Sequence, residues 1–236
     1  MDSHTLKKDT NNTKIDTTLQ GLKVNFLFWI ILIICLLIIN KSSGKYKFYE
    51  TIISFYLAAV TGFFSHVISH SYDFEKLYTE SDNCVTRFLK QDINLNSVIL
   101  FFARQFDFHS KIHHNSTINK QPLNILIECI QNIISQGSLV LISSINILGL
   151  NFNVDKNAIL FWTLIYVTVH NINYNFVNRQ LHINHHIDET TNYGMIFQLD
   201  NMFNSNYDVT MIENNNYYII NIIVITVLII VLKIYV

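Results

Sequence analysis

Residues 22–39 read LKVNFLFWIILIICLLII, an apolar run whose one charged residue is Lys23. A helix of roughly 17 to 25 mostly apolar residues can cross the hydrocarbon core of a bilayer. The run therefore predicts a first membrane span. Because no clear small-residue cleavage site follows it, we expect an uncleaved span rather than a signal peptide.

The composition of the whole chain agrees with a membrane protein. Half of the 236 residues are hydrophobic and only 14% are charged, which is unlike an ordinary soluble domain. The formal net charge of -1, with no concentrated basic run, excludes nucleic acid as a partner. Three cysteines without a Cys-x-x-Cys pair predict neither a disulfide framework nor a thiolate metal site.

Further apolar runs indicate an all-α integral membrane helical bundle of four or five spans. Three of them have spanning length: about 51–68, about 158–176 and 217–236. Residues 123–150 are also apolar, but Glu128 and Gln131 make the first half amphipathic, and we expect it at the membrane interface before the chain enters the bilayer. Residues 1–20 are polar and predict a disordered tail, which leaves 21–236 as a single membrane-embedded domain.

The basic residues predict which side of the membrane each loop occupies. Polar segments 71–122 and 177–216 lie on the same side as the N-terminal tail if the spans alternate. With Lys23, at the start of the first span, this side holds eleven Lys and Arg residues against four on the other side. Cytoplasmic segments are enriched in Lys and Arg. We therefore predict that the tail is cytoplasmic and that the two polar segments form a cytoplasmic cap.

Nine of the ten histidines gather in four places, each next to an apolar run. Three places have the patterns H-x-x-x-H, H-x-x-x-H-H and H-x-x-H-H, and the fourth is one histidine near the end of the run 158–176. Residues three and four apart share a helix face, so each pattern can aim its imidazoles at one point, as metal ligands require. The residues are His66 and His70; His109, His113 and His114; His182, His185 and His186; and His170.

Imidazole ligands suit iron, zinc, copper or nickel, and the ligands alone do not choose among these metals. The eight histidines of the three patterns could bind two metal ions and leave positions open for oxygen. His170 is a candidate ligand, a partner of a ligand or a packing residue. Asp107 and Asp188, beside two of the patterns, either accept the outer N–H of a ligating histidine or are solvated loop residues. For Glu128 we favour an interfacial position without a role at the site.

The three patterns resemble the histidine boxes of the fatty acid hydroxylase and sterol desaturase superfamily of membrane di-iron oxygenases. The likeness covers about residues 50–208. It is closest at the third box, where HINHH at 182–186 is followed by NYG at 192–194 and by DNMF at 200–203, similar to the family's H-x-x-H-H, N-Y-G and D-x-x-F series. The second box has three residues before its histidine pair where the hydroxylase branch usually has two, which indicates a divergent member.

This resemblance implies that the eight box histidines bind two iron ions, and that dioxygen is used to hydroxylate or desaturate a lipid such as a fatty acyl chain or a sterol. It also implies an endoplasmic reticulum membrane with the boxes facing the cytoplasm. Electrons would come from a separate protein such as cytochrome b5, since the chain has no G-x-G-x-x-G nucleotide motif. The turn at 192–194 is expected to be structural, with Gly194 adopting a conformation that other residues resist.

Two alternatives stay open. Residues 61–66, TGFFSH, are similar to the lipid desaturases that make vinyl-ether phospholipids, although a further histidine of that branch, beyond the second box, is absent. The alternative from another class is a transporter or a non-catalytic metal-binding membrane protein. Transporters bind their substrates near the bilayer midplane on broken helices, whereas these histidines lie at span ends and in polar segments, which favours an enzyme.

Overall fold

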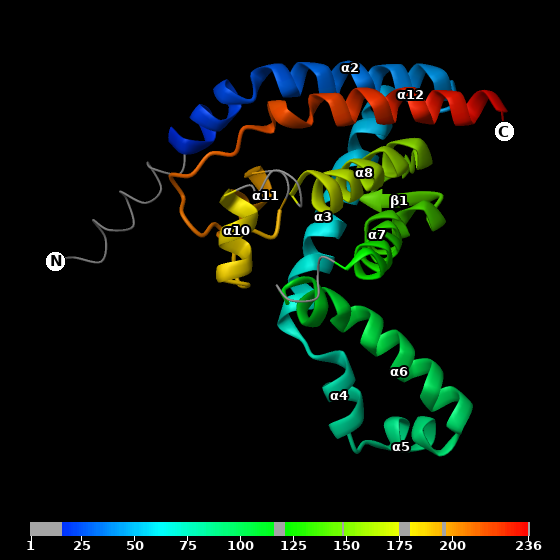
Figure 1. Cartoon of the computed structure of the whole chain (residues 1–236). Coiled ribbons are helices and arrows are strands. Elements are labelled where there is room, and N and C mark those ends of the chain that lie inside the picture. Colours follow the sequence, from blue (N-terminus) through cyan, green and yellow to red (C-terminus); the bar gives the residue numbers. More distant parts are fainter. Residues whose placement is uncertain (1–15, 116–120, 148, 175–179, 195–196, 236) are drawn as a thin grey trace. The chain divides into compact units, whose positions relative to one another are not determined.

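The computed structural model describes residues 16–115, 121–147, 149–174, 180–194 and 197–235. Most of them are helical, as Figure 1 shows. The chain divides into two compact units: unit 1 holds Met1–Phe63 and Asn132–Val236, and unit 2 holds Phe64–Gln131. Residues 16–20, predicted to belong to a disordered tail, are helical, and the rest of that predicted tail, with His4, lies outside the described residues.

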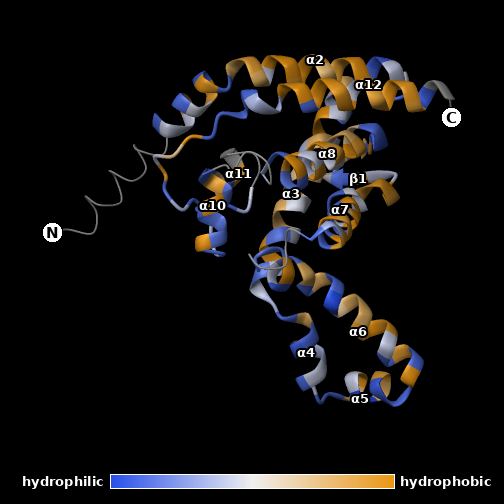
Figure 2. Cartoon of the chain, in the orientation of Figure 1, coloured by the Kyte–Doolittle hydropathy of each residue, from blue (hydrophilic) through white to orange (hydrophobic). Residues whose placement is uncertain are grey.

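Three helices are long and apolar enough to cross a membrane: Phe26–Ser43, Phe48–Ser71 and Asn215–Lys233. They confirm the first, second and last apolar runs as helices of spanning length. The first is α2 and the second is α3, whereas the third comprises the short helix η4 (Asn215–Tyr218) and most of α12 (Ile219–Tyr235). Within unit 1, α2 and α12 lie side by side and are apolar along most of their length (Figure 2).

The fourth predicted span, about 158–176, contains the helix α8 (Lys156–Thr168) and the π-helix η3 (Val169–Asn173). Asp155 caps α8, accepting hydrogen bonds from the backbone N–H groups of Asn157 and Ala158 at 3.0 and 3.4 Å. Its second carboxylate oxygen accepts from the Thr51 hydroxyl of α3 at 2.6 Å. Most α8 side chains are buried within unit 1, so this helix is part of its core. His170 lies in η3, directly after α8.

The apolar run 123–150 does not form one continuous helix. It forms α7 (Pro122–Gly137), a 3-10 turn η2 (Ser138–Leu141) and an antiparallel hairpin of β1 (Ser144–Ile147) and β2 (Leu150–Asn153). The prediction of an all-α chain is therefore wrong at this hairpin. Gly149, at φ 83°, allows the tight turn, and Asn146 donates to Asn151 across the strands at 3.0 Å.

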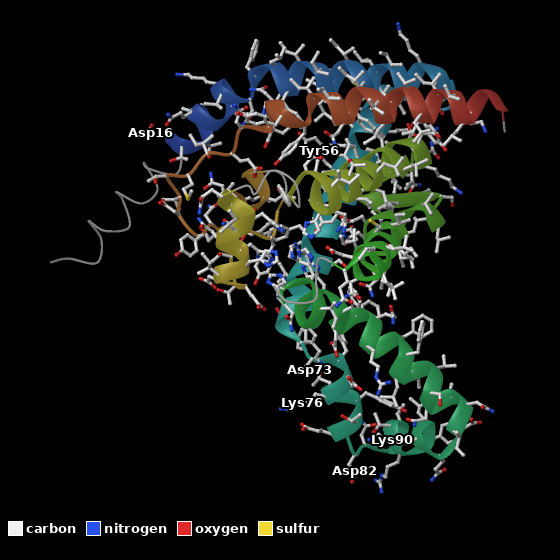
Figure 3. All side chains as sticks on the ribbon, viewed as in Figure 1. Asp16, Tyr56, Asp73, Lys76, Asp82 and Lys90 are labelled. Atoms are coloured by element: carbon white, nitrogen blue, oxygen red, sulfur yellow. The ribbon has the colours of Figure 1, made fainter. Side chains whose placement is uncertain are left out.

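In unit 2 the polar segment 71–122 forms consecutive helices. They are α4 (Phe74–Glu80), α5 (Cys84–Gln91) and α6 (Ile93–Phe108), followed by the π-helix η1 (His109–His113). Asp73, Asn83 and Asp92 cap α4, α5 and α6 with their side chains. Figure 3 labels Asp73, Lys76, Asp82 and Lys90 on α4, α5 and the turns that bound α4. The capped helices bring the second histidine box back beside the end of α3.

The third box lies in unit 1 on α10 (Gln180–Ile187), and α11 (Phe197–Phe203) follows it. The last residues of the predicted fourth span, 175 and 176, lie outside the described residues.

Candidate metal centre

In unit 2 the first and second histidine boxes meet. His66 and His70 are four residues apart near the end of α3 and therefore share a face. The Nε2 atoms of His66 and His109 lie 2.8 Å apart, and the ring centroids of His70 and His114 lie 4.5 Å apart. One ligand atom from each of His66, His70 and His109 lies within 4.8 Å of the others. These three histidines could hold a metal ion.

The second box adopts a π-helix, and this explains its unusual spacing. In a π-helix the backbone N–H bonds to the carbonyl five residues earlier, so residue i+5 comes one turn above residue i. The His109 ring consequently approaches both members of the following pair, with centroids 4.8 Å from His113 and 5.3 Å from His114. In a regular α-helix the i+5 position would point away from this face.

The nitrogen distances fit ligands of a common ion. Two imidazole nitrogens bound at about 2.1 Å and at right angles to each other are about 3.0 Å apart. The His66–His109 separation of 2.8 Å is close to that value. A second close pair, His182 and His186, is described below and has the same geometry.

Asp107 braces the second box instead of accepting from a histidine. It is 1% exposed, and its carboxylate accepts hydrogen bonds from the backbone N–H groups of Phe74 and Glu75 at 2.7 and 2.9 Å. Lys111, within the π-helix, lies 3.1 Å from Asp107 and 2.9 Å from Asp73. This buried carboxylate is neither a solvated loop residue nor, through these contacts, a partner of a ligand, and it fixes the start of α4 to the end of α6.

Glu128 lies in the site, although the sequence favoured an interfacial position for it. Its side chain is 3% exposed, and one carboxylate oxygen lies 2.8 Å from Nδ1 of His113. Glu128, His109 and His113 each offer a ligand atom within 4.8 Å of the others. On the next turn of α7, Gln131 donates to the backbone and side-chain oxygens of Gln105 on α6, both at 2.9 Å. These bonds hold this stretch of α7 against the last turn of α6.

In unit 1 the third box lies beside His170. On α10 the Nε2 atoms of His182 and His186 are 3.0 Å apart. The centroid of the His170 ring lies 4.9 Å from that of His182, and Tyr174 stacks on His182 at 4.3 Å. His170 is 3% exposed and stacks on Tyr166 at 5.2 Å. The single histidine that the sequence left open thus belongs to the same cluster as the third box.

His185 is completely buried, and its Nδ1 lies 2.6 Å from the backbone oxygen of Thr191. A carbonyl oxygen only accepts hydrogen bonds, so Nδ1 carries the proton and Nε2 is the nitrogen left for a metal. The orienting partner is therefore a backbone carbonyl. Asp188, which was a candidate for such a role, instead accepts from the backbone N–H and hydroxyl of Thr190 at 3.1 and 2.6 Å.

The N-Y-G and D-x-x-F segments support the third box structurally. Asp200 is 4% exposed and accepts from the Gly194 N–H at 2.8 Å and from the Ser205 hydroxyl at 2.7 Å. Burial raises the pKa of Asp200 to about 7, against the opposing effect of these hydrogen bonds. Within the N-Y-G segment the residue with a left-handed backbone is Asn192, at φ 53°, and not Gly194. Asn192 donates to the Leu181 carbonyl of α10 at 3.1 Å.

Comparisons of the chain with protein-family models, with curated proteins and with solved structures found no match. The resemblance to the membrane hydroxylases therefore rests on the histidine boxes and on the segments that follow the third box.

The histidine cluster described in unit 2 includes an acidic residue, Glu128, to which the sequence analysis gave no role at the site. The sequence spacing predicted which histidines share a helix face. The structure agrees for His66 and His70 in unit 2 and for His182 and His186 in unit 1. Glu128 carried a signal that could have found it, because an ionisable residue in an apolar stretch usually has a partner or a function. Its partner, His113, is fifteen residues away and could not be read from periodicity.

Proposed function

We propose that this chain is a membrane-bound non-haem di-iron oxidoreductase that uses dioxygen to hydroxylate or desaturate a lipid. The observation that carries the proposal is the close approach of imidazole nitrogens in both units, 2.8 Å between His66 and His109 and 3.0 Å between His182 and His186. Imidazole is the commonest protein ligand of metal ions, and these distances match neighbouring ligands of one ion.

The donor set fits iron. Imidazole with a nearby carboxylate is a nitrogen and oxygen set suited to non-haem iron, and no described cysteine belongs to the clusters, as it would in many structural zinc sites. In the proposal the two ions are held by His66, His70, His109, His113, His114, His182, His185 and His186, with His170 as a further ligand or a partner of one. Bound iron supplies the reduction of dioxygen to an oxidant that can remove hydrogen from an unactivated C–H bond.

The chain's own residues bind and orient the ligands. The Thr191 carbonyl fixes the proton of His185 on Nδ1, and the π-helix presents His109, His113 and His114 together. His113 is buried, and His109 and His114 are half-buried. Three apolar helices of spanning length support a lipid as the substrate, because a lipid reaches such a site from the bilayer.

In the proposed arrangement the box histidines face the cytoplasm at the endoplasmic reticulum membrane. Electrons arrive from a separate protein such as cytochrome b5, and four or five segments of the chain cross the bilayer.

The test is lipid and sterol mass spectrometry of cells that express the chain beside cells that express His185→Ala. We expect a hydroxylated or desaturated lipid that depends on the intact chain and is lost in the variant, while the His4→Ala variant, altered outside the boxes, retains it. Identical lipid profiles in cells with the intact chain and cells with His185→Ala would contradict the proposal and would favour a transporter or a non-catalytic metal-binding protein.

A further inference from the structure

Glu128 differs from every other residue of the cluster in unit 2 because it is an acid. It lies on α7, its side chain is 3% exposed, and its oxygen is 2.8 Å from His113 Nδ1. Burying a carboxylate costs free energy of desolvation unless the carboxylate is paired. A hydrogen bond from a metal-binding histidine offsets part of that cost.

The two ring nitrogens of His113 point in different directions, and Nδ1 is the one that contacts Glu128. In the close pairs of this chain the nitrogens that approach each other are Nε2 atoms, as between His66 and His109. His185 shows the same division, since its Nδ1 is engaged by the Thr191 carbonyl and its Nε2 is left for a metal. By this pattern, His113 presents Nε2 to the metal and donates its Nδ1–H to Glu128.

We propose that Glu128 is the positioning residue of His113, an anionic acceptor that fixes the Nδ1–H form of this ligand and strengthens its Nε2 as a donor. The proposal rests on the metal centre of the proposed function and adds an acid that the eight histidines do not provide. Carboxylate–histidine–metal arrangements orient the ring and raise the basicity of the ligand.

Electrostatics supports an acid at this position. Neutral imidazoles do not offset the positive charge that divalent ions bring into a buried region, whereas one carboxylate partly does. The backbone carbonyl that holds His185 has no net charge. The metal position served by His113 is therefore expected to bind a divalent ion more tightly than a position without an anionic partner.

The variants Glu128→Gln and Glu128→Leu separate charge from hydrogen bonding. Glutamine keeps an oxygen that can accept the Nδ1–H and loses the charge, while leucine loses both. The matched control is Glu75→Gln in the same unit, which removes a carboxylate that binds Arg104 at 2.8 Å and belongs to no group of candidate ligands.

The experiment measures binding of Co²⁺ to the purified full chain by chelator competition and by the absorption spectrum of the bound ion. Loss of an orienting partner typically weakens metal binding about 10- to 100-fold. We expect Glu128→Leu to bind one Co²⁺ about 10- to 100-fold more weakly than wild type. The Co²⁺ affinity of Glu128→Gln should lie between those of Glu128→Leu and wild type, and that of Glu75→Gln should equal wild type. The spectrum of the bound ion should change only in the Glu128 variants.

Thermal unfolding with and without Co²⁺ excludes a purely structural role. A purely structural role would lower the melting temperature of a Glu128 variant equally with and without Co²⁺. If Glu128 positions His113 for the metal, its loss instead reduces the rise in melting temperature on adding Co²⁺. Equal Co²⁺ affinity in wild type and Glu128→Leu would overturn the inference and leave the proposed function standing. Weakened binding in a chain that oxidises no lipid would support the inference and contradict the proposed function.

Discussion

His66 and His109 are 43 residues apart in the sequence, and their Nε2 atoms lie 2.8 Å apart in unit 2. The first comes from the end of α3 and the second begins the π-helix after α6. Local periodicity cannot produce this contact, because α4, α5 and α6 intervene. The capped helices and the hydrogen bonds from the start of α4 to Asp107 bring the end of α6 back beside the end of α3.

Loss of His109 is predicted to be more damaging to metal binding than loss of His66, which belongs to one group of candidate ligands. His109 belongs to the group with His66 and His70 and also to the group with His113 and Glu128. We expect His109→Ala to lower the metal content of the purified chain more than His66→Ala, while His4→Ala has no effect. Mass spectrometry of bound metal measures this, and equal metal content in all three variants would contradict the assignment of these ligands.

The stability of the folded chain is predicted to fall as pH rises, through Asp200. Burial raises the pKa of this carboxyl from 3.8 to about 7. Between these pH values the folded chain keeps a proton that the unfolded chain releases, so the free energy of unfolding decreases as pH increases toward 7. Asp200→Asn removes this titration. Its amide oxygen can accept from the Gly194 N–H, and its NH2 group can donate to the Ser205 hydroxyl oxygen. Melting temperatures from pH 5 to pH 8 should decline more steeply for wild type than for Asp200→Asn, and parallel profiles would refute the prediction.

Asp155→Ala is predicted to destabilise unit 1. The aspartate caps α8 and also accepts from Thr51, and it is completely buried. Losing a cap costs about 1 kcal/mol, and an unsatisfied buried hydroxyl adds a cost of about the same size. Asp92→Ala, which removes an exposed cap of α6, is the matched control and should cost less. Denaturant unfolding of both variants in detergent tests this, and a larger loss for Asp92→Ala would count against the account.

The topology prediction concerns the N-terminal tail, which the distribution of Lys and Arg places in the cytoplasm. A tag at the N-terminus should be accessible to protease in cells permeabilised only at the plasma membrane, as should sites in residues 81–92 of the predicted cap. A tag that becomes accessible only after the internal membranes are dissolved would reverse the orientation.

The apolar runs of α2, α3 and α12 were predictable because a helix of spanning length needs nothing beyond composition. The pairing of His182 with His186 was equally predictable from four-residue spacing on a helix. In each case the decisive information is local.

Other features depend on contacts that no local pattern encodes. The hairpin at 144–153 interrupts an apolar run because Gly149 and the asparagine pair favour a turn over a helix. The π-helix of the second box shifts the register of His113 and His114, and regular helical spacing does not anticipate it. The burial of Asp107 and Glu128 follows from partners 33 and 15 residues away.

The central claim is that the clustered histidines hold iron that reacts with dioxygen at a lipid. The most direct measurement uses the purified chain, with iron counted per chain and oxygen uptake recorded when lipid extract and a reductant are added. We predict two iron ions per chain and a lipid-dependent oxygen uptake that is absent in His185→Ala. A chain that carries no iron, or that carries iron and consumes no oxygen with any lipid fraction, would contradict the account.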